Sequence, residues 1–250
     1  MNAMITIAGI TLRQLLSRRR TLLLLGLGAV PVLLALAYRL SGEASDDGDA
    51  LSWTMGMLEY LGMVTVMPLI ALIFGTGAIG AELEDGTAVH LLTKPVPRWQ
   101  VGIAKYLVAA GCAAVLSAIP IGIAGLLGAN EASAAIGYAI GAAIGAAIYV
   151  AIFMALSLVT SRSFVIGLGY VLIWEGLLAG LFPGIASLSV RQYAISFAET
   201  ITDGLSTLAN DLEPRVAIGA AIIGAAVVTV AALAIALRRL SRLEIAGETG

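Results

Sequence analysis

Residues 134–160 read AAIGYAIGAAIGAAIYVAIFMALSLVT and contain no charged side chain. An α-helix needs about 20 apolar residues to cross the roughly 30 Å of hydrocarbon in a bilayer, and this run is longer than that. In lipid, only helices and closed barrels satisfy all of their own backbone hydrogen bonds. Barrel strands alternate between apolar and polar residues, which this run does not do. The run therefore predicts a transmembrane helix.

Five further apolar runs without lysine or arginine accompany this one. They lie near residues 21–38, 54–80, 106–128, 163–182 and 216–237. The short connections between most of them favour antiparallel neighbours in a helical bundle. The sequence thus predicts an all-α, polytopic membrane protein, in which residues 1–250 form a single transmembrane domain of six helices.

The composition agrees with lipid surroundings. Apolar residues make up 60% of the chain and charged residues 12%, whereas soluble domains carry about 25% charged residues. The mean hydropathy is +0.99. The net charge of −2 provides no basic surface for nucleic acid, and Cys112 is the single cysteine, so no internal disulfide forms. A soluble domain, a nucleic-acid binder and a disulfide scaffold are thereby excluded.

The distribution of lysine and arginine predicts the orientation. If the N-terminus is cytoplasmic, all but three of the 14 cationic residues face the cytoplasm, and only Arg39, Arg191 and Arg215 lie on the far side. Cytoplasmic loops of membrane proteins carry an excess of these residues. We therefore expect a multi-pass protein of the plasma (cytoplasmic) membrane of a prokaryote, with both termini cytoplasmic.

Two segments are too polar to be spans. Residues 2–20 carry apolar groups at helical spacing and a basic face that includes Arg13, which predicts a helix in the headgroup plane. A plain cytoplasmic extension of the first span is the alternative. In residues 183–214, Tyr193 and Phe197 belong to an apolar repeat of three to four residues. We expect amphipathic helices that cover the outer mouth of the bundle, with a re-entrant hairpin as the alternative.

Glycines recur at every fourth position in two of the predicted spans. One set is Gly137, Gly141 and Gly145, and the other is Gly176, Gly180 and Gly184. Such stripes allow helix backbones to approach closely in lipid. We expect the first stripe to pack within the subunit, whereas the second could pack within it or across a dimer axis.

The sequence predicts no catalytic and no metal site. The chain has one histidine, His90, and one cysteine, and they lie on different segments. A phosphate-binding loop of the Walker A type needs Gly-Lys followed by Ser or Thr. The only lysines, Lys94 and Lys105, are preceded by Thr93 and Ala104. If ATP powers this protein, the ATPase must be a separate polypeptide.

The most informative connection joins the second and third spans. It reads ELEDGTAVHLLTKPVPR over residues 82–98. The apolar and acidic residues of its first part predict a short amphipathic helix, in which Gly86 permits a bend. Pro95 and Pro97 then require an extended exit before the next span. A short rigid helix at the inner end of a bundle is a shape on which another protein can act.

This connection resembles that of the permease subunits of ABC-2-type ABC transporters. The resemblance rests on Glu82-x-x-x-Gly86-Thr87, on Leu91-Leu92-Thr93-Lys94-Pro95-Val96-Pro97-Arg98, and on Lys105. Six spans, an N-terminal interfacial helix and a long outer connection between spans five and six agree with it.

The resemblance implies a dimer of such subunits, bound to two cytoplasmic ATPase subunits that hold ATP and Mg²⁺. The second permease is a copy of this chain or a related one, and this chain itself binds no cofactor. The 82–98 connection would act as a coupling helix seated on the ATPase, and the family usually moves its substrate outward. The residues implied in coupling are Glu82, Gly86, Thr87, Lys94, Pro95 and Arg98.

Two acidic residues within predicted spans are candidates for lining the pathway. Glu175 lies about 20 Å from the inner end of the fifth span, where a carboxyl is costly unless it faces the bundle interior, water or a partner. The alternative is a hydrogen bond to Tyr170 or to an outer-loop group, which serves packing. Glu59 shares a helical stripe with methionines and could instead lie near the outer surface.

Two other classes of function compete with an ATP-driven exporter. An ion-coupled secondary transporter would use carboxylates and no ATPase, and it predicts inverted repeats with broken helices. We find no convincing internal repeat. An intramembrane enzyme would need a nucleophile and a base, which the sequence does not pair.

Overall fold

The computed structural model describes residues 2–16, 18–41, 47–84, 97–179, 187–202 and 216–242. Within these ranges the protein is helical and contains no strand, which confirms the predicted all-α class. The helices are α1 (Asn2–Leu15), α2 (Arg18–Leu40), α3 (Asp47–Met57), η1 (Leu58–Val66), α4 (Met67–Glu84), α6 (Arg98–Ala129), α7 (Ala132–Val159), α8 (Ser163–Gly169), η2 (Tyr170–Leu178), α10 (Val190–Ile201) and α11 (Ile218–Arg242). The segments η1 and η2 are π-helical.

Five helices in the described part of the chain are long and apolar enough to span a membrane. They cover Thr21–Leu40, Asp49–Gly80, Arg98–Ala129, Ala132–Val159 and Ile218–Arg242. The predicted fifth span, 163–182, corresponds to a shorter apolar helix, Ser163–Leu178. At 1.5 Å per residue this helix is about 24 Å long, less than the hydrocarbon thickness. A count of six spans therefore stays a prediction.

The second span begins earlier than the sequence predicted. Residues 47–84 form one continuous helix through α3, η1 and α4, so the acidic residues Asp47 and Asp49 belong to its first turn rather than to a loop. Acidic residues near a helix N-terminus interact favourably with the helix dipole. The carboxylate of Asp49 in this first turn therefore favours the extension of the helix beyond the apolar run.

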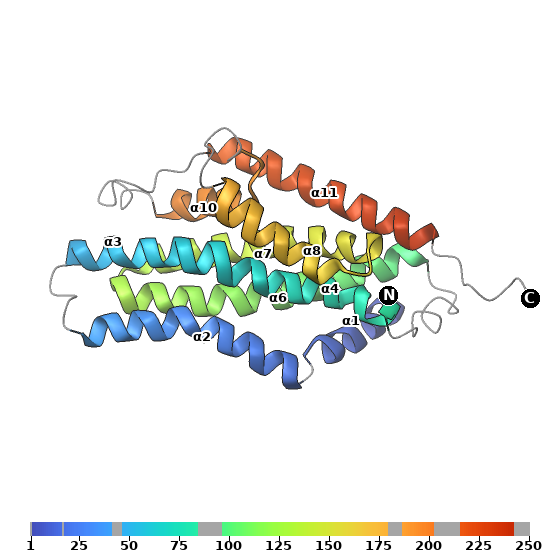
Figure 1. Ribbon diagram of the computed structural model, residues 1–250, viewed down its shortest axis with the longest axis horizontal. Coiled ribbons are helices and arrows are strands. Elements are labelled where there is room, and N and C mark those ends of the chain that lie inside the picture. Colours follow the sequence, from blue (N-terminus) through green and yellow to red (C-terminus); the bar gives the residue numbers. More distant parts are fainter. Residues whose placement is uncertain are drawn as a thin grey trace, which may run out of the picture.

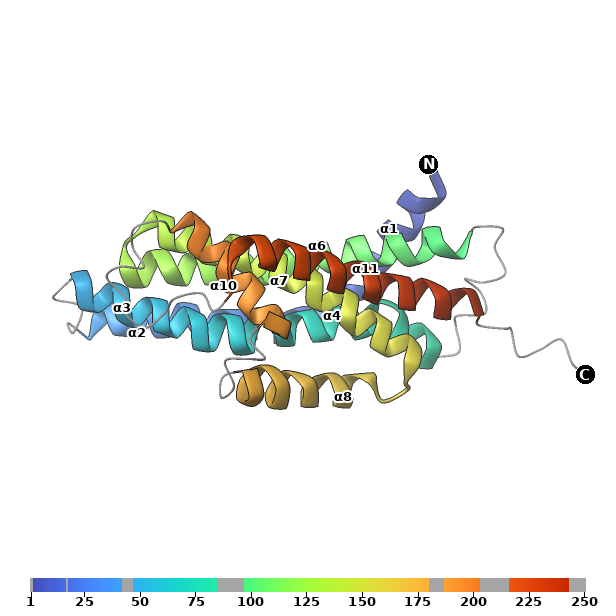
Figure 2. The same cartoon turned by 90° about the horizontal axis from the view of Figure 1, so that it is seen from above.

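The long helices run side by side along the longest axis of the molecule (Figure 1). Helix α7 lies at the centre and contacts α4, α6, α10 and α11. Its Tyr138, Tyr149 and Phe153 side chains are fully buried. Helix α8 and η2 pack along one side of this bundle (Figure 2). The core therefore lies around α7, whose sequence contains no charged side chain.

One end of the bundle carries the start of α6 and the ends of α4, α7 and α11, together with α1 (Figure 1). We call it the inner end, after the predicted orientation. In α1, Thr11 and Leu15 are buried against the bundle, whereas Ile5 and Leu12 of the predicted apolar face are exposed. This leaves apolar side chains available to lipid. The position of α1 in the headgroup plane stays a prediction.

Helix α10 packs on the glycine stripe of α7, which consists of Gly137, Gly141 and Gly145. We call this packing surface the glycine seat. A Cβ atom added at Gly137 or Gly141 would lie closer than 3.0 Å to a backbone oxygen of α10, on Ala198 or Ala194. A Cβ at Gly145 would meet Ala194 equally closely. Only glycine permits this approach of two backbones. The stripe thus packs within the subunit, as predicted.

Helix α10 lies inside the bundle rather than over its outer mouth. Nine of its residues are buried, including Arg191, Gln192 and Glu199. Its first turn contacts Glu175 in η2, and it then runs outward along α7. This differs from the predicted amphipathic helix over the outer mouth, and the re-entrant alternative stays a prediction, because residues 180–186 lie outside the described residues. The cause is the glycine stripe, which opens a groove for the small residues of α10.

The glycine seat leads to a stability prediction. Substituting Gly141 by alanine should lower the free energy of unfolding by about 1–3 kcal/mol, because the added methyl group overpacks against α10. Substituting Gly111 on α6, where a Cβ would meet nothing within 4 Å, should stabilise the helix by roughly 0.5–1 kcal/mol. Thermal unfolding in detergent measures both. Equal shifts for the two variants would contradict the predicted seat.

Candidate functional site

Arg98 connects the inner ends of the third and last spans. It is the first residue of α6, and its Nη1 donates hydrogen bonds to the carbonyl oxygens of Leu240 (3.3 Å) and Ser241 (3.0 Å) in the last turn of α11. The last carbonyls of a helix lack partners within it and carry the negative end of the dipole, so a guanidinium stabilises them. Arg98 therefore holds the start of α6 against the end of α11.

Lys105 connects the third span to the second. Its side chain is 1% exposed, and Nζ donates a hydrogen bond to the carbonyl oxygen of Ala78 at 2.9 Å. A buried ammonium group inside an apolar bundle is stable only when such partners satisfy it. Ala78 lies one helical turn before Glu82 on α4. Lys105 thus fixes the inner turns of α4 to α6.

These contacts fix both flanks of the 82–98 connection. Glu82 lies in the last turn of the α4 backbone, and its side chain is outside the described residues, as are Gly86, Thr87, Lys94 and Pro95. Of the six predicted coupling residues, Arg98 is therefore the one whose side chain the structure describes. The family resemblance implied a role for Arg98 in coupling to an ATPase. Its hydrogen bonds to carbonyls of α11 add a role within the subunit.

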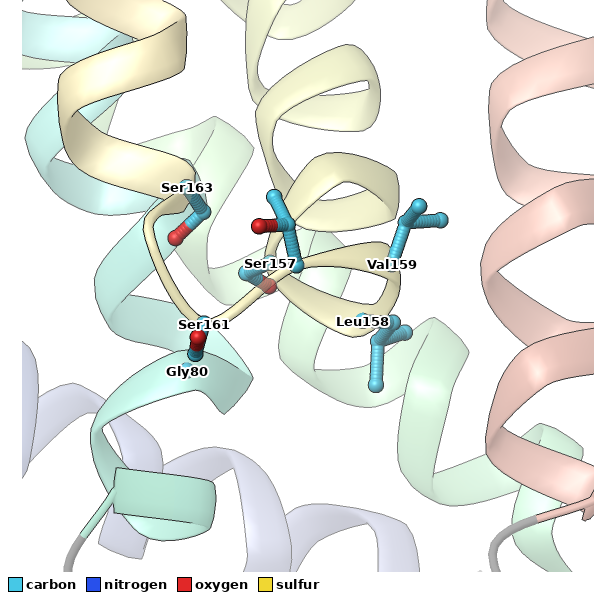
Figure 3. A pocket seen from close by; sticks show the side chains of 7 residues that line it. Gly80, Ser157, Leu158, Val159, Ser161 and Ser163 are labelled. Carbon is cyan, nitrogen blue, oxygen red and sulfur yellow. The ribbon is translucent and has the colours of Figure 1, made fainter.

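A cavity that several hydroxyl groups line opens beside the inner end of α4. It has a volume of about 250 Å³ and lies between Gly80 and the turn that joins α7 to α8 (Figure 3). The hydroxyl-bearing residues that line it are Ser157, Thr160, Ser161 and Ser163. The Thr160 oxygen accepts the backbone N–H of Arg162 at 3.2 Å, which holds the turn in place. The described inner surface beside Gly80 is therefore concave and carries hydroxyl groups.

Glu175 lies at the centre of a buried polar cluster. Its side chain is fully buried, and its carboxylate accepts hydrogen bonds from the Ser189 hydroxyl, the Val190 backbone N–H (3.1 Å) and the Tyr170 hydroxyl (3.2 Å). A carboxylate at a helix N-terminus binds unpaired N–H groups and the positive end of the dipole. Glu175 thus anchors α10 to η2, as the packing alternative predicted. A pathway role stays a prediction.

Glu59 is partly buried on η1, and it and Glu199 both act electrostatically on Tyr138 in α7. The methionines of its stripe, Met55 and Met63, are buried in the core, which fits their interpretation as packing residues. Whether Glu59 lines a pathway stays a prediction.

Sequence reasoning missed Lys105 and Arg191 as interior residues. Arg191 is 5% exposed, although the sequence places it in an outer connection. One signal was available: Arg191 follows Leu188-Ser189-Val190 and precedes an apolar repeat. Lys105 stands directly before a span, at a position where lysine commonly extends to the membrane surface.

The Glu175 cluster generates the second prediction. Substituting Glu175 by glutamine removes the negative charge and replaces one acceptor oxygen by an NH2 group, so the charge-assisted hydrogen bonds that the carboxylate accepts from Ser189, Val190 and Tyr170 are weakened. We expect a loss of about 2 kcal/mol in unfolding free energy. Glu131 is exposed at the start of α7, and its glutamine variant should unfold like the wild type in the same thermal assay. A Glu175 variant of unchanged stability would contradict the anchoring role.

Comparison with known proteins agrees with this arrangement. The model of a family described as ABC-2 family transporter protein matches residues 16–174. The matched region runs from the end of α1 into η2 and includes the entire 82–98 connection, with Arg98 and Lys105. No curated protein matches the chain. Because the family match covers more than half of the sequence, this multi-pass membrane protein belongs to the ABC-2 family of transporter proteins, as a permease.

Proposed function

We propose that this chain is the membrane-spanning permease subunit of an ATP-driven ABC exporter. It works as a dimer, with a second copy of itself or a related permease, in the plasma membrane of a prokaryote with both termini cytoplasmic. Separate ATPase subunits bind ATP and Mg²⁺ and act on the 82–98 connection. The family match over this connection supports the proposal, and so does the absence of a Walker A lysine in the sequence.

The proposal is supported most directly by two sets of hydrogen bonds that join helices next to the 82–98 connection. Arg98 holds α6 to α11, and Lys105 holds α6 to α4. A force applied to the connection therefore acts on three helices together. Helix α6 extends from Arg98 at the inner end to Ala129 at the outer end, so its displacement reaches both faces of the membrane.

The mechanism follows from two-state energetics. Closure of the ATPase pair on ATP shifts the connection, and the tied helices transmit this shift toward the outer end. Nucleotide binding must favour one state over the other by a few kcal/mol to change the populations usefully. Glu82, Gly86, Thr87, Lys94 and Pro95 are the proposed contacts with the ATPase. Arg98 has the second role of transmitting the motion to α11. Glu59 and Glu175 are proposed pathway residues.

Co-purification tests the assignment of the connection. The chain is expressed with an ATPase encoded by a neighbouring reading frame, and the complex is isolated through a tag on the permease. Substituting Glu82 by arginine reverses a charge at the proposed contact and should reduce recovery of the ATPase at least tenfold, a loss of about 1.4 kcal/mol. The matched control is Glu131→Arg, at the exposed outer turn before α7.

Full recovery of the ATPase with the Glu82 variant would refute the assigned contact. Failure of the wild-type chain to bind any ATPase, combined with substrate movement by the purified chain under an ion gradient, would favour the ion-coupled secondary transporter instead.

A further inference from the structure

An apolar groove runs along the surface of the bundle between α6 and α7, in their outer halves. We call it the outer groove. It has a volume of about 420 Å³, and the alanine, isoleucine and leucine residues that line it include Ile119, Ile123, Leu126, Ala132, Ile136 and Ala139. A Cβ added at Gly122, which also lines it, would lie 3.2 Å from the Cβ of Ala139. Small residues therefore bring the two helices together at the floor of the groove, and exposed isoleucines form its walls.

An aromatic pair shows where the groove lies in the membrane. Trp53 of α3 stacks on Tyr38 of α2, with ring centroids 4.0 Å apart. Tryptophan and tyrosine concentrate at the membrane–water interface. Thr54, the residue after Trp53, packs on Gly128 in the last turn of α6, so the aromatic pair is level with that turn. The groove extends inward from Leu126 by about 10 Å, and it therefore lies in the hydrocarbon of the outer leaflet.

A cation stands at the outer end of this groove. Helix α2 packs beside α6 (Figure 1), and Nη1 of Arg39 donates a hydrogen bond to the carbonyl oxygen of Leu127 at 3.3 Å. Leu127 adjoins Leu126, which lines the groove. The Arg39 side chain is exposed, and a guanidinium has five N–H donors, so further donors are available to a ligand. In the predicted orientation Arg39 is also one of three cationic residues on the far side, against the usual bias.

The charges at the outer end select the headgroup of a lipid. A guanidinium binds phosphate through paired N–H donors. Two acidic residues are exposed at the same end: Asp49, one helical turn before Trp53, and Glu131, directly before Ala132. They disfavour a headgroup with a net negative charge and favour one that carries a cationic group beside its phosphate. A phospholipid with a phosphate and an ammonium group meets both conditions, and its acyl chain matches the apolar groove.

We infer that the outer groove binds one acyl chain of a zwitterionic phospholipid of the outer leaflet, whose phosphate is held by Arg39. The site faces the bilayer rather than the bundle interior, so this lipid is a resident of the protein surface and not a cargo. It contacts α2, α6 and α7 at once and holds their outer ends together. The inference goes beyond the proposed function and does not depend on an ATPase.

The test uses native mass spectrometry of the purified full chain in micelles of tetraethylene glycol monooctyl ether. The probe is palmitoyl-oleoyl phosphatidylethanolamine, and its affinity is obtained from the fraction of protein that carries one bound lipid. We expect saturable binding that is about threefold or more tighter than that of palmitoyl-oleoyl phosphatidylglycerol. The second lipid has the same acyl chains and a net negative headgroup, so the comparison isolates the effect of headgroup charge.

Two pairs of variants locate the site. Arg39→Gln should weaken binding of phosphatidylethanolamine about fivefold or more, whereas Arg162→Gln, at an exposed arginine of the inner end, should bind like the wild type. Ala132→Phe fills the outer part of the groove and should weaken binding severalfold. Its control is Ala226→Phe, at an exposed alanine in the outer half of α11. If one of the two site variants fails to fold, the other decides.

Unchanged affinity in both Arg39→Gln and Ala132→Phe would overturn the inference. Equal or tighter binding of phosphatidylglycerol would overturn the assignment of a zwitterionic headgroup. A second copy of the chain is the other occupant that an apolar groove could take. In that case Ala132→Phe should reduce the dimer in the same spectra and leave the bound lipid unchanged, which would also contradict the inference.

Discussion

Hydrocarbon offers no hydrogen-bond partner, so every polar group inside this bundle must be satisfied by the chain itself or by what the chain binds. Many polar groups of the described interior follow this constraint. Thr54 and Ser117 donate to carbonyl oxygens of their own helices, Lys105 donates to a carbonyl of α4, and Glu175 accepts from the start of α10. Each contact between helices also fixes their relative position. Polar contacts between helices thus hold the helices of this otherwise apolar structure in place.

The polar contacts between helices lie at two levels of the bundle. Arg98 and Lys105 connect α6 to α11 and α4 at the inner end, next to the connection that the proposed ATPase acts on. Glu175 connects η2 to α10 in the middle of the bundle. Between these levels lies α7, whose glycine stripe holds α10 by shape alone. A motion that begins at the inner end therefore reaches α10 through tied, closely packed helices.

The sequence predicted the features that depend on local composition. The apolar runs located five long helices, and the loop pattern 82–98 agreed with the family later matched over residues 16–174. Features that depend on tertiary contacts were not predictable. The apolar repeat around Tyr193 and Phe197 looks the same whether α10 lies on the surface or inside a glycine groove. The burial of Lys105 and Arg191 likewise depends on helices that are distant in sequence, and the apolar flanks of Arg191 are the one local signal for it.

The central claim is that ATP acts on this chain from its inner end through the tied helices. A cysteine placed at Ser52, exposed near the outer end of α3, reports on this in a Cys112→Ser background. In the complex with its ATPase, ATP should change the rate of thiol labelling by about fivefold or more. Substituting Arg98 by glutamine should remove most of that change while the complex stays assembled. A labelling rate that ATP leaves unchanged in the otherwise native complex would contradict the account.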